Sequence, residues 1–180
     1  MKINIFLLAI LFLVMQSCKK EEEYIPEAPF NQVITALKNG AKWKGYSNTP
    51  FDKKKGWVTI RGAVYTQYGE RRQSFYINKI PFKVGTYAMK ADADHHKDDG
   101  FLYSNFSTTG SDGDVLIDLY DLDDAKIKDC FVKVEKVDSV ARRISGTFQV
   151  YLKIRTPKYD TANPDKLSFE KGVFDLILNP

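Results

Sequence analysis

One segment of the chain alternates apolar and polar side chains with a period that favours a β-strand. Between Ile144 and Ile154, the even positions are apolar and most odd positions are polar. Successive side chains of a strand point to opposite faces, so one set shares a buried face while the other set meets water. A helix would spread the same apolar residues around its surface. Gly146, on the apolar side, indicates a close approach or a bend.

Weaker versions of this alternation recur along the chain. In the segment Val115–Tyr120, the apolar set is Val115, Ile117 and Leu119. The other alternating segments are Trp57–Tyr65, Ser74–Lys79, Val132–Glu135 and Val173–Leu178, and shorter candidates are Val33–Lys38, Lys42–Tyr46, Thr86–Met89 and Phe101–Phe106.

Turn residues separate these segments. Asn39-Gly40 is the strongest hairpin signal, because both residues tolerate positive φ. The longest expected connection is Thr156–Lys166, and a short helix is expected near Asp121–Lys128 with Asp123 as its cap. Further turns are expected at Tyr68–Glu70, Val84–Thr86, Ser111–Asp114 and Glu170–Gly172.

Short strands with little helix indicate an all-β fold. We expect residues 31–180 to form a single domain of about 9 or 10 antiparallel strands. A β-sandwich and a calycin-like β-barrel both suit this pattern, and the sequence leaves the choice between them open.

The N-terminus has a different composition. Residues Ile5–Met15 form an uninterrupted apolar run of 11 residues behind Lys2. As a helix the run would span roughly 16 Å, whereas a bilayer core is about 30 Å thick. It therefore has the character of the apolar region of a secretory signal rather than of a membrane span.

The end of this signal, Met15-Gln16-Ser17-Cys18, resembles the bacterial lipobox. The resemblance implies a signal peptide of residues 1–17, cleavage between Ser17 and Cys18, and a diacylglycerol on the Cys18 thiol. Together with a further acyl chain such as palmitate, this would hold the protein firmly at a membrane. The alternative is an ordinary secretory signal with an incidental cysteine.

The residues behind Cys18 are similar to the export signal of Bacteroidota-type lipoproteins. They are Lys19, Lys20, Glu21 and Glu22. The similarity implies an outer-membrane lipoprotein exposed on the cell surface, with the periplasmic leaflet as the alternative. Residues 18–30 are acidic and contain prolines, which is typical of a tether, and a charge run is often no more than a solvated tether.

Charge and cysteine content give no support to a nucleic-acid partner or to an intrachain disulfide. The chain has 27 basic and 23 acidic residues, too even a balance to predict a nucleic-acid partner. Its basic clusters, Lys53–Lys55 and Arg71-Arg72, fall in expected turns. With Cys18 assigned to lipid, Cys130 has no partner for an intrachain disulfide, and we expect it to be a small, half-buried strand residue.

An acidic loop, Asp92–Gly100, is the one segment that suggests a metal. It holds both histidines, His95 and His96, among four aspartates. Carboxylate oxygens favour calcium, but the spacing fits no known calcium loop, and a hydrated loop is the simpler interpretation. We expect no cofactor, with calcium as the alternative, held by Asp92, Asp94, Asp98 or Asp99.

Aromatic residues suggest binding more than catalysis. Tyrosines at polar positions of strands, such as Tyr76 and Tyr151, would form an outward platform for sugar rings or a peptide, although core packing explains most aromatic residues of a β-protein. Trp43, Tyr46, Trp57 and Tyr65 also lie on or beside expected strands. No nucleophile elbow, phosphate-binding loop or cysteine metal motif occurs, so we do not expect an enzyme.

Three parts of the chain resemble a group of uncharacterised Bacteroidota lipoproteins. They are the opening Phe30–Trp43, the Ile-Ser-Gly-Thr-Phe segment Ile144–Phe148 and the closing Gly172–Phe174. The resemblance implies a β-domain and an envelope address, and carries no catalytic residues. We therefore expect a membrane-anchored, non-catalytic domain that binds a glycan, a peptide or an outer-membrane protein. A scaffold without a ligand is the alternative, and a carboxylate-dependent hydrolase a minor one.

Overall fold

The computed structural model describes residues 23–27, 30–91, 101–155 and 157–179, and it is almost entirely β. The predicted residues Ser17–Glu22, His95, His96 and the four aspartates of the acidic loop lie outside the described residues. The strands, in chain order, are β1 (Gln32–Lys38), β2 (Ala41–Asn48), β3 (Phe51–Asp52), β4 (Trp57–Tyr65), β5 (Arg71–Pro81), β6 (Gly85–Ala88), β7 (Tyr103–Thr109), β8 (Leu116–Leu122), β9 (Phe131–Asp138), β10 (Arg143–Ile154) and β11 (Lys166–Ile177).

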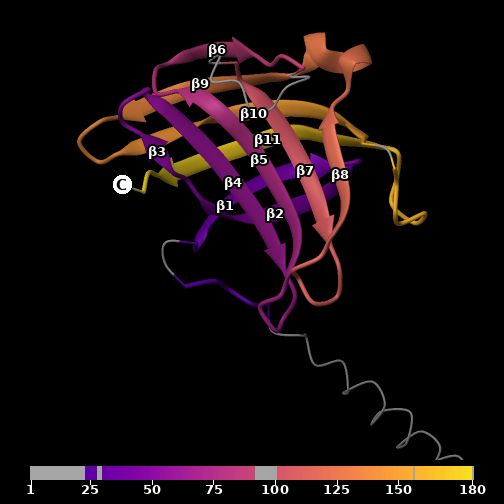
Figure 1. Cartoon of the computed structure of the whole chain (residues 1–180). Coiled ribbons are helices and arrows are strands. Elements are labelled where there is room, and N and C mark those ends of the chain that lie inside the picture. Colours follow the sequence, from indigo (N-terminus) through magenta and orange to yellow (C-terminus); the bar gives the residue numbers. More distant parts are fainter. Residues whose placement is uncertain (1–22, 28–29, 92–100, 156, 180) are drawn as a thin grey trace, which may run out of the picture.

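Eight of these strands close into an antiparallel barrel. The order is β1-β2-β4-β5-β7-β8-β10-β11, and β11 pairs back onto β1 (Figure 1). Strands that follow one another in this series are neighbours in space, so the barrel is of the up-and-down type. The prediction of an all-β fold is confirmed, and of its two forms the structure has the barrel.

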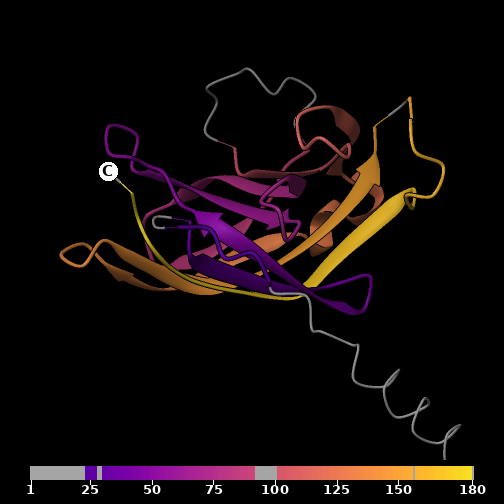
Figure 2. The ribbon, with the colours of Figure 1, turned by 90° about the horizontal axis from the view of Figure 1, so that it is seen from below.

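The remaining strands extend the wall at one end of the barrel. Because β10 is long, its C-terminal part pairs with β8 while its N-terminal part pairs with β9, and β9 carries β6 on its other edge. The short β3 pairs with β4. In Figure 2 the β10–β11 loop projects on the side of the molecule away from the C-terminus.

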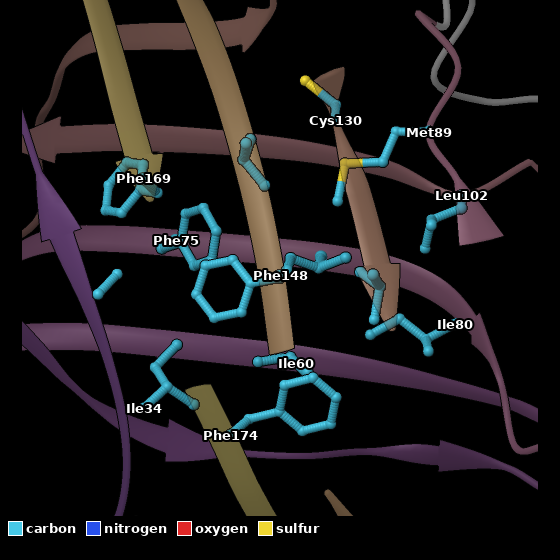
Figure 3. Packing of buried hydrophobic residues seen from close by; sticks show 14 of the residues in the cluster. Ile34, Ile60, Phe75, Ile80, Met89, Leu102, Cys130, Phe148, Phe169 and Phe174 are labelled. Carbon is cyan, nitrogen blue, oxygen red and sulfur yellow. The ribbon is translucent and has the colours of Figure 1, made fainter. Parts of the chain in front are cut away.

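Aromatic rings fill the centre of the barrel (Figure 3). Phe75 stacks on Phe169 with ring centroids 4.5 Å apart and on Phe148 at 5.4 Å. Trp43 meets Phe169 edge-on at 5.2 Å. All four side chains are buried. The hollows described below therefore lie on the outer surface of the barrel.

Two glycines allow close approaches of β10 and β11, one to a core ring and the other to the backbone of β9. A Cβ on Gly172 would lie 2.5 Å from the ring of Phe148, and one on Gly146 would lie 2.0 Å from the carbonyl oxygen of Lys133. The close approach predicted at Gly146 is confirmed. In the same strand, Ile144, Val150 and the other apolar even positions are buried or half-buried, as the alternation predicts.

The orientation expected for β8 is wrong. Asp118, Tyr120 and Leu122 are buried, whereas Val115 is 54% exposed and Ile117 and Leu119 are only half-buried. A carboxylate can face inward here because the β10–β11 loop satisfies it. The Tyr159 amide N–H donates to Asp118 Oδ1 at 2.8 Å, and Asn163 Nδ2 donates to Oδ2 at 2.7 Å.

Most expected turns are present, with one correction. Asn39-Gly40 forms the β1–β2 turn with φ values of 48° and 80°. The expected turn at Glu170–Gly172 is instead a bulge inside β11, where Lys171 has a φ of 51°. Asp123 caps a 3₁₀ helix, η1 (Asp124–Asp129), close to the expected helix.

Two further observations concern membrane-spanning helices and Cys130. No helix among the described residues has the length and apolar character needed to cross a membrane. Cys130 is fully buried, rather than half-buried in a strand as expected, and it lies directly before β9 at the end of η1. Its sulfur accepts the Tyr151 amide N–H at 3.3 Å. Burial raises the pKa of its thiol.

Candidate functional site

Three adjacent strands present a hollow of about 180 Å³ on the outer face of the barrel. We call it the tyrosine hollow. Its floor lies on β2, β4 and β5, whose pairing is continuous. Its lining residues are Phe30, Tyr46, Asn48, Arg61, Gly62, Ala63, Tyr65, Arg71, Ser74 and Tyr76.

Side-chain size along the strands creates this hollow. On β4, the outward residues are Arg61, Ala63 and Tyr65, so a small side chain lies between two large ones. The strand register places Ala63 opposite Tyr46 on β2 and opposite Ser74 on β5. Two small side chains thus lie side by side and leave a depression between larger neighbours.

The neighbouring rows of the sheet supply the walls. Arg61 pairs with Asn48 on one side and with Tyr76 on the other. Tyr65 pairs with Arg71 at the beginning of β5. Cross-strand neighbours of this kind lie about 5 Å apart, so the walls close around Ala63 and Ser74.

The charge of the hollow is positive. Neither Arg61 nor Arg71 forms an ion pair with any residue that the structure describes, and the described residues that line the hollow include no carboxylate. Burial raises the pKa of the Tyr65 hydroxyl, while the charge of Arg71 acts in the opposite direction. The Tyr65 phenol is therefore neutral beside an uncompensated guanidinium.

A segment preceding β1 contacts two of the lining tyrosines, Tyr46 and Tyr65. We call residues 23–27 the N-terminal strap, which is the indigo coil along the lower edge of the sheet in Figure 1. Glu23 accepts hydrogen bonds from Lys44 Nζ and from the Tyr46 hydroxyl, each at 2.7 Å. The bond from Lys44, followed by that from Tyr46, lowers the pKa of the Glu23 carboxyl.

Aromatic and apolar contacts complete the docking of the strap. The Tyr24 ring lies 5.7 Å from the Tyr65 ring, between centroids, and its edge covers Gly69. Pro26 is buried. This part of the expected tether of residues 18–30 is therefore held against the barrel rather than extended away from it.

The two tyrosines expected on a common outward platform lie in different places. Tyr76 joins Tyr46 and Tyr65 at the hollow, but Tyr151 lies elsewhere on β10 and donates its hydroxyl proton to Glu170 at 2.9 Å. Sequence reasoning missed Arg61, and it placed Arg71 in a turn although Arg71 begins β5. The small Ala63 between Arg61 and Tyr65 is the signal that could have revealed the depression.

The other hollows have different chemistry. One of about 630 Å³ contains Arg143 and Asp175, but these neutralise each other through Arg143 Nε to Asp175 Oδ1 at 2.6 Å. Within the described residues, no group of three or more His, Cys, Asp or Glu side chains is arranged to hold a metal. Asp112, in the β7–β8 turn, accepts the Asp114 and Val115 amide protons and so serves the turn itself.

The tyrosine hollow can recognise one ring-sized polar group. A volume of about 180 Å³ corresponds to about six water molecules at about 30 Å³ each. Tyrosine faces pack against the apolar face of a sugar ring, Asn48 and Ser74 offer hydrogen bonds to hydroxyls, and guanidinium groups bind carboxylates in a bidentate manner. No family model, curated protein or solved structure matches the chain, so this chemistry is the basis for assigning a role.

Proposed function

We propose that this protein is a lipid-anchored, non-catalytic β-barrel of the bacterial outer membrane, exposed on the cell surface, that binds an acidic sugar in the tyrosine hollow. The observation that carries the ligand class is the pair Arg61 and Arg71, which lack an ion pair among the described residues and flank a tyrosine-walled depression. A uronic or sialic acid matches both the ring-sized space and the positive charge.

The side chains of the described lining residues, none of which is a carboxylate, support binding rather than hydrolysis. Glycoside hydrolysis generally needs two carboxyl groups that flank the scissile bond. The residues that line the tyrosine hollow offer guanidinium, phenol, amide and hydroxyl groups instead. A sugar would therefore be held there and released unchanged.

A glycan array followed by calorimetric titration tests the ligand. We expect binding to glycans that end in uronic or sialic acid, and about 10- to 150-fold weaker affinity for Arg61→Gln or Arg71→Gln, because a charged hydrogen bond contributes about 1.5–3 kcal/mol. Ala63→Leu should abolish binding by filling the depression. Tyr159→Ala, which changes an exposed tyrosine of the β10–β11 loop, is the matched control.

Two results would contradict the proposed ligand. The first is an array without acidic glycans among the bound spots. The second is unchanged affinity in Ala63→Leu, provided that its thermal unfolding matches that of the unsubstituted protein. In either case the sugar would not occupy the tyrosine hollow.

The membrane anchor and the cellular location are tested separately from the ligand. Mass spectrometry of the protein purified from its natural host should find a mature N-terminus at Cys18 that carries acyl chains. Protease treatment of intact cells should degrade the protein if it faces outward, whereas full protection would place it in the periplasmic leaflet. An unmodified Cys18 thiol, or a retained leader, would contradict the anchor.

The filled interior of the barrel also suits the second candidate function, an envelope scaffold without a small ligand. Its core rings leave the wall, rather than the centre, as the surface for contacts. Under that function the Arg61→Gln and Ala63→Leu variants would leave every cellular property of the protein unchanged. A glycan that binds the unsubstituted protein and fails to bind Ala63→Leu would decide against it.

A further inference from the structure

A second surface, next to the tyrosine hollow, has the chemistry of a phosphate-binding membrane contact. We call it the lysine groove: a depression of about 450 Å³ on the outer face of β1 and β2, beside the bulge in β11. It is lined by Thr35, Ala36, Leu37, Lys42, Trp43, Lys44 and Lys171. Its surface is mostly apolar with a lysine rim, and Val173, which pairs with Thr35, is 49% exposed beside it.

The bulge determines where the lysines lie. Between β1 and β11 the register shifts, so that Thr35 pairs with Val173 but Leu37 pairs with Glu170. Lys171 occupies the resulting irregularity with a φ of 51° and lines the groove from the β11 side. Lys42, which pairs with Leu37, lines it from the β2 side.

Two of the three lysines have no counter-ion among the residues that the structure describes. Lys44 is paired with Glu23 at 2.7 Å. Lys42 and Lys171 form no ion pair with any residue in the described ranges. An exposed apolar surface between two uncompensated cations is complementary to an anionic, partly apolar partner, as lipid headgroups at a membrane surface are.

The N-terminal strap brings the anchor to this groove. Glu23 is docked on Lys44 at the edge of the groove, and Cys18 precedes it by five residues. Five residues span at most about 18 Å when fully extended. A lipid on Cys18 therefore keeps the bilayer surface close to the lysine groove for as long as the strap remains docked.

We infer that the lysine groove lies on the anchoring membrane and binds the phosphate groups of anionic phospholipids through Lys42 and Lys171. This inference rests on the proposed acylation of Cys18. The barrel would then lie with β1, β2 and β11 toward the bilayer rather than stand off on a free tether. Each lysine near an anionic surface strengthens binding by about fivefold.

A fluorescent reporter in the groove tests the orientation. The acylated protein, carrying Thr35→Cys labelled with an environment-sensitive nitrobenzoxadiazole dye, is reconstituted into vesicles of phosphatidylcholine alone or mixed with phosphatidylglycerol. Acylation occupies the Cys18 thiol, and Cys130 is only 1% exposed, so the label is specific. Val140→Cys, in the β9–β10 turn at the opposite end of β10 from the β10–β11 loop, is the control position.

The expected result is a blue shift and brighter emission at position 35 on phosphatidylglycerol vesicles, with no change at position 140. The double substitution Lys42→Gln and Lys171→Gln should remove the shift, as should molar salt, whose screening length is about 3 Å. The double substitution Lys53→Gln and Lys54→Gln, which removes the same charge from the exposed β3–β4 turn, should retain it.

Each contrary outcome has its own meaning. If the acylated protein shows no emission shift at position 35, the proposed orientation on the membrane is wrong, but the anchor is unaffected. The same holds if the shift survives the Lys42 and Lys171 substitutions. Mass spectrometry of the same sample that finds Cys18 unmodified overturns both. An equal shift produced by inorganic phosphate without vesicles would show that the groove takes free phosphate, and would also overturn the membrane assignment.

Discussion

At the scale of single residues, Gly146 determines how closely β10 approaches β9, and Gly172 determines how closely β11 approaches the core rings. They face different obstacles. A side chain at Gly172 would meet a phenyl ring, whereas one at Gly146 would meet the backbone carbonyl of Lys133 first. A substitution can replace the phenyl ring by a smaller side chain, but no substitution removes the backbone oxygen.

This difference predicts different responses to alanine. Gly172→Ala should lower the free energy of unfolding by about 1–3 kcal/mol, the usual cost of overpacking. Adding Phe148→Leu should recover at least about 1 kcal/mol relative to the sum of the two single substitutions. Gly146→Ala should show no such recovery when combined with Phe174→Leu. Urea denaturation of the six variants and the unsubstituted protein measures these energies, and additive energies for the Gly172 pair would contradict the packing described.

The surroundings of Lys38 disfavour its positive charge. Its ammonium group lies 4.4 Å from the centroid of the Phe106 ring and donates to Gln73 Oε1 at 3.2 Å, and it has no ion pair among the described residues. Trp43 Nε1 donates to the same oxygen at 3.0 Å. Burial lowers the pKa of Lys38 to about 8 from its ordinary 10.5.

The shift at Lys38 predicts a pH dependence of known sign. Between about pH 8 and pH 10.5 the unfolded chain retains a proton that the folded protein has released, so stability rises with pH in this window. Relative to Lys38→Met, the unsubstituted protein should gain about 1–2 kcal/mol between pH 7 and pH 10, allowing for partial solvation. Other titrating groups, including Cys130, are common to both proteins and cancel. A constant difference across this range in urea denaturation would contradict the lowered pKa.

At the scale of elements, the β1–β2 hairpin depends on Asn39 in two ways, through its backbone conformation and through a side-chain hydrogen bond. Asn39 adopts a φ of 48°, which few residues tolerate, and its Oδ1 accepts the Ser168 amide N–H at 2.8 Å. The hairpin is thereby tied to β11 as well as turned back on itself. The lysine groove lies on the two strands that this turn connects.

Two substitutions separate these two effects. Asn39→Gly keeps the positive φ but loses the hydrogen bond, and should cost about 1 kcal/mol. Asn39→Ala loses both and should cost about 1–2 kcal/mol more. Thermal and urea unfolding give the two values. Equal stability of the two variants would mean that the turn conformation carries no strain.

At the scale of the whole molecule, the alternation of side chains predicts the wall of the barrel well and its surface sites poorly. The even positions of β10 could be assigned to the core because little else competes with burial there. In β8 the same reasoning fails, because Asp118 is buried through hydrogen bonds from a loop about 40 residues further along the chain. Hydrogen bonds between residues so far apart in the chain produce no recognisable pattern in the sequence around Asp118.

The tyrosine hollow shows the same limit. Tyr76 could be identified as outward-facing from its own strand, but the depression exists only because Ala63 lies beside Ser74 across a strand pair. Its depth and charge depend on the pairing register, which brings Asn48, Arg61 and Tyr76 into one row. A single sequence does not encode that register in any short motif. The bulge at Lys171, mistaken for a turn, is hidden for a similar reason.

The most direct test of the proposed role is an NMR titration of the isotope-labelled protein with glucuronic acid. We expect the amide resonances of Ala63, Ser74 and Tyr76 to shift in a saturable manner, while Thr147 on the distant outer face of β10 does not shift. The shifts should be absent in Ala63→Leu. Resonances that stay in place around the hollow, or that move equally throughout the barrel, would contradict a sugar site between Arg61 and Arg71.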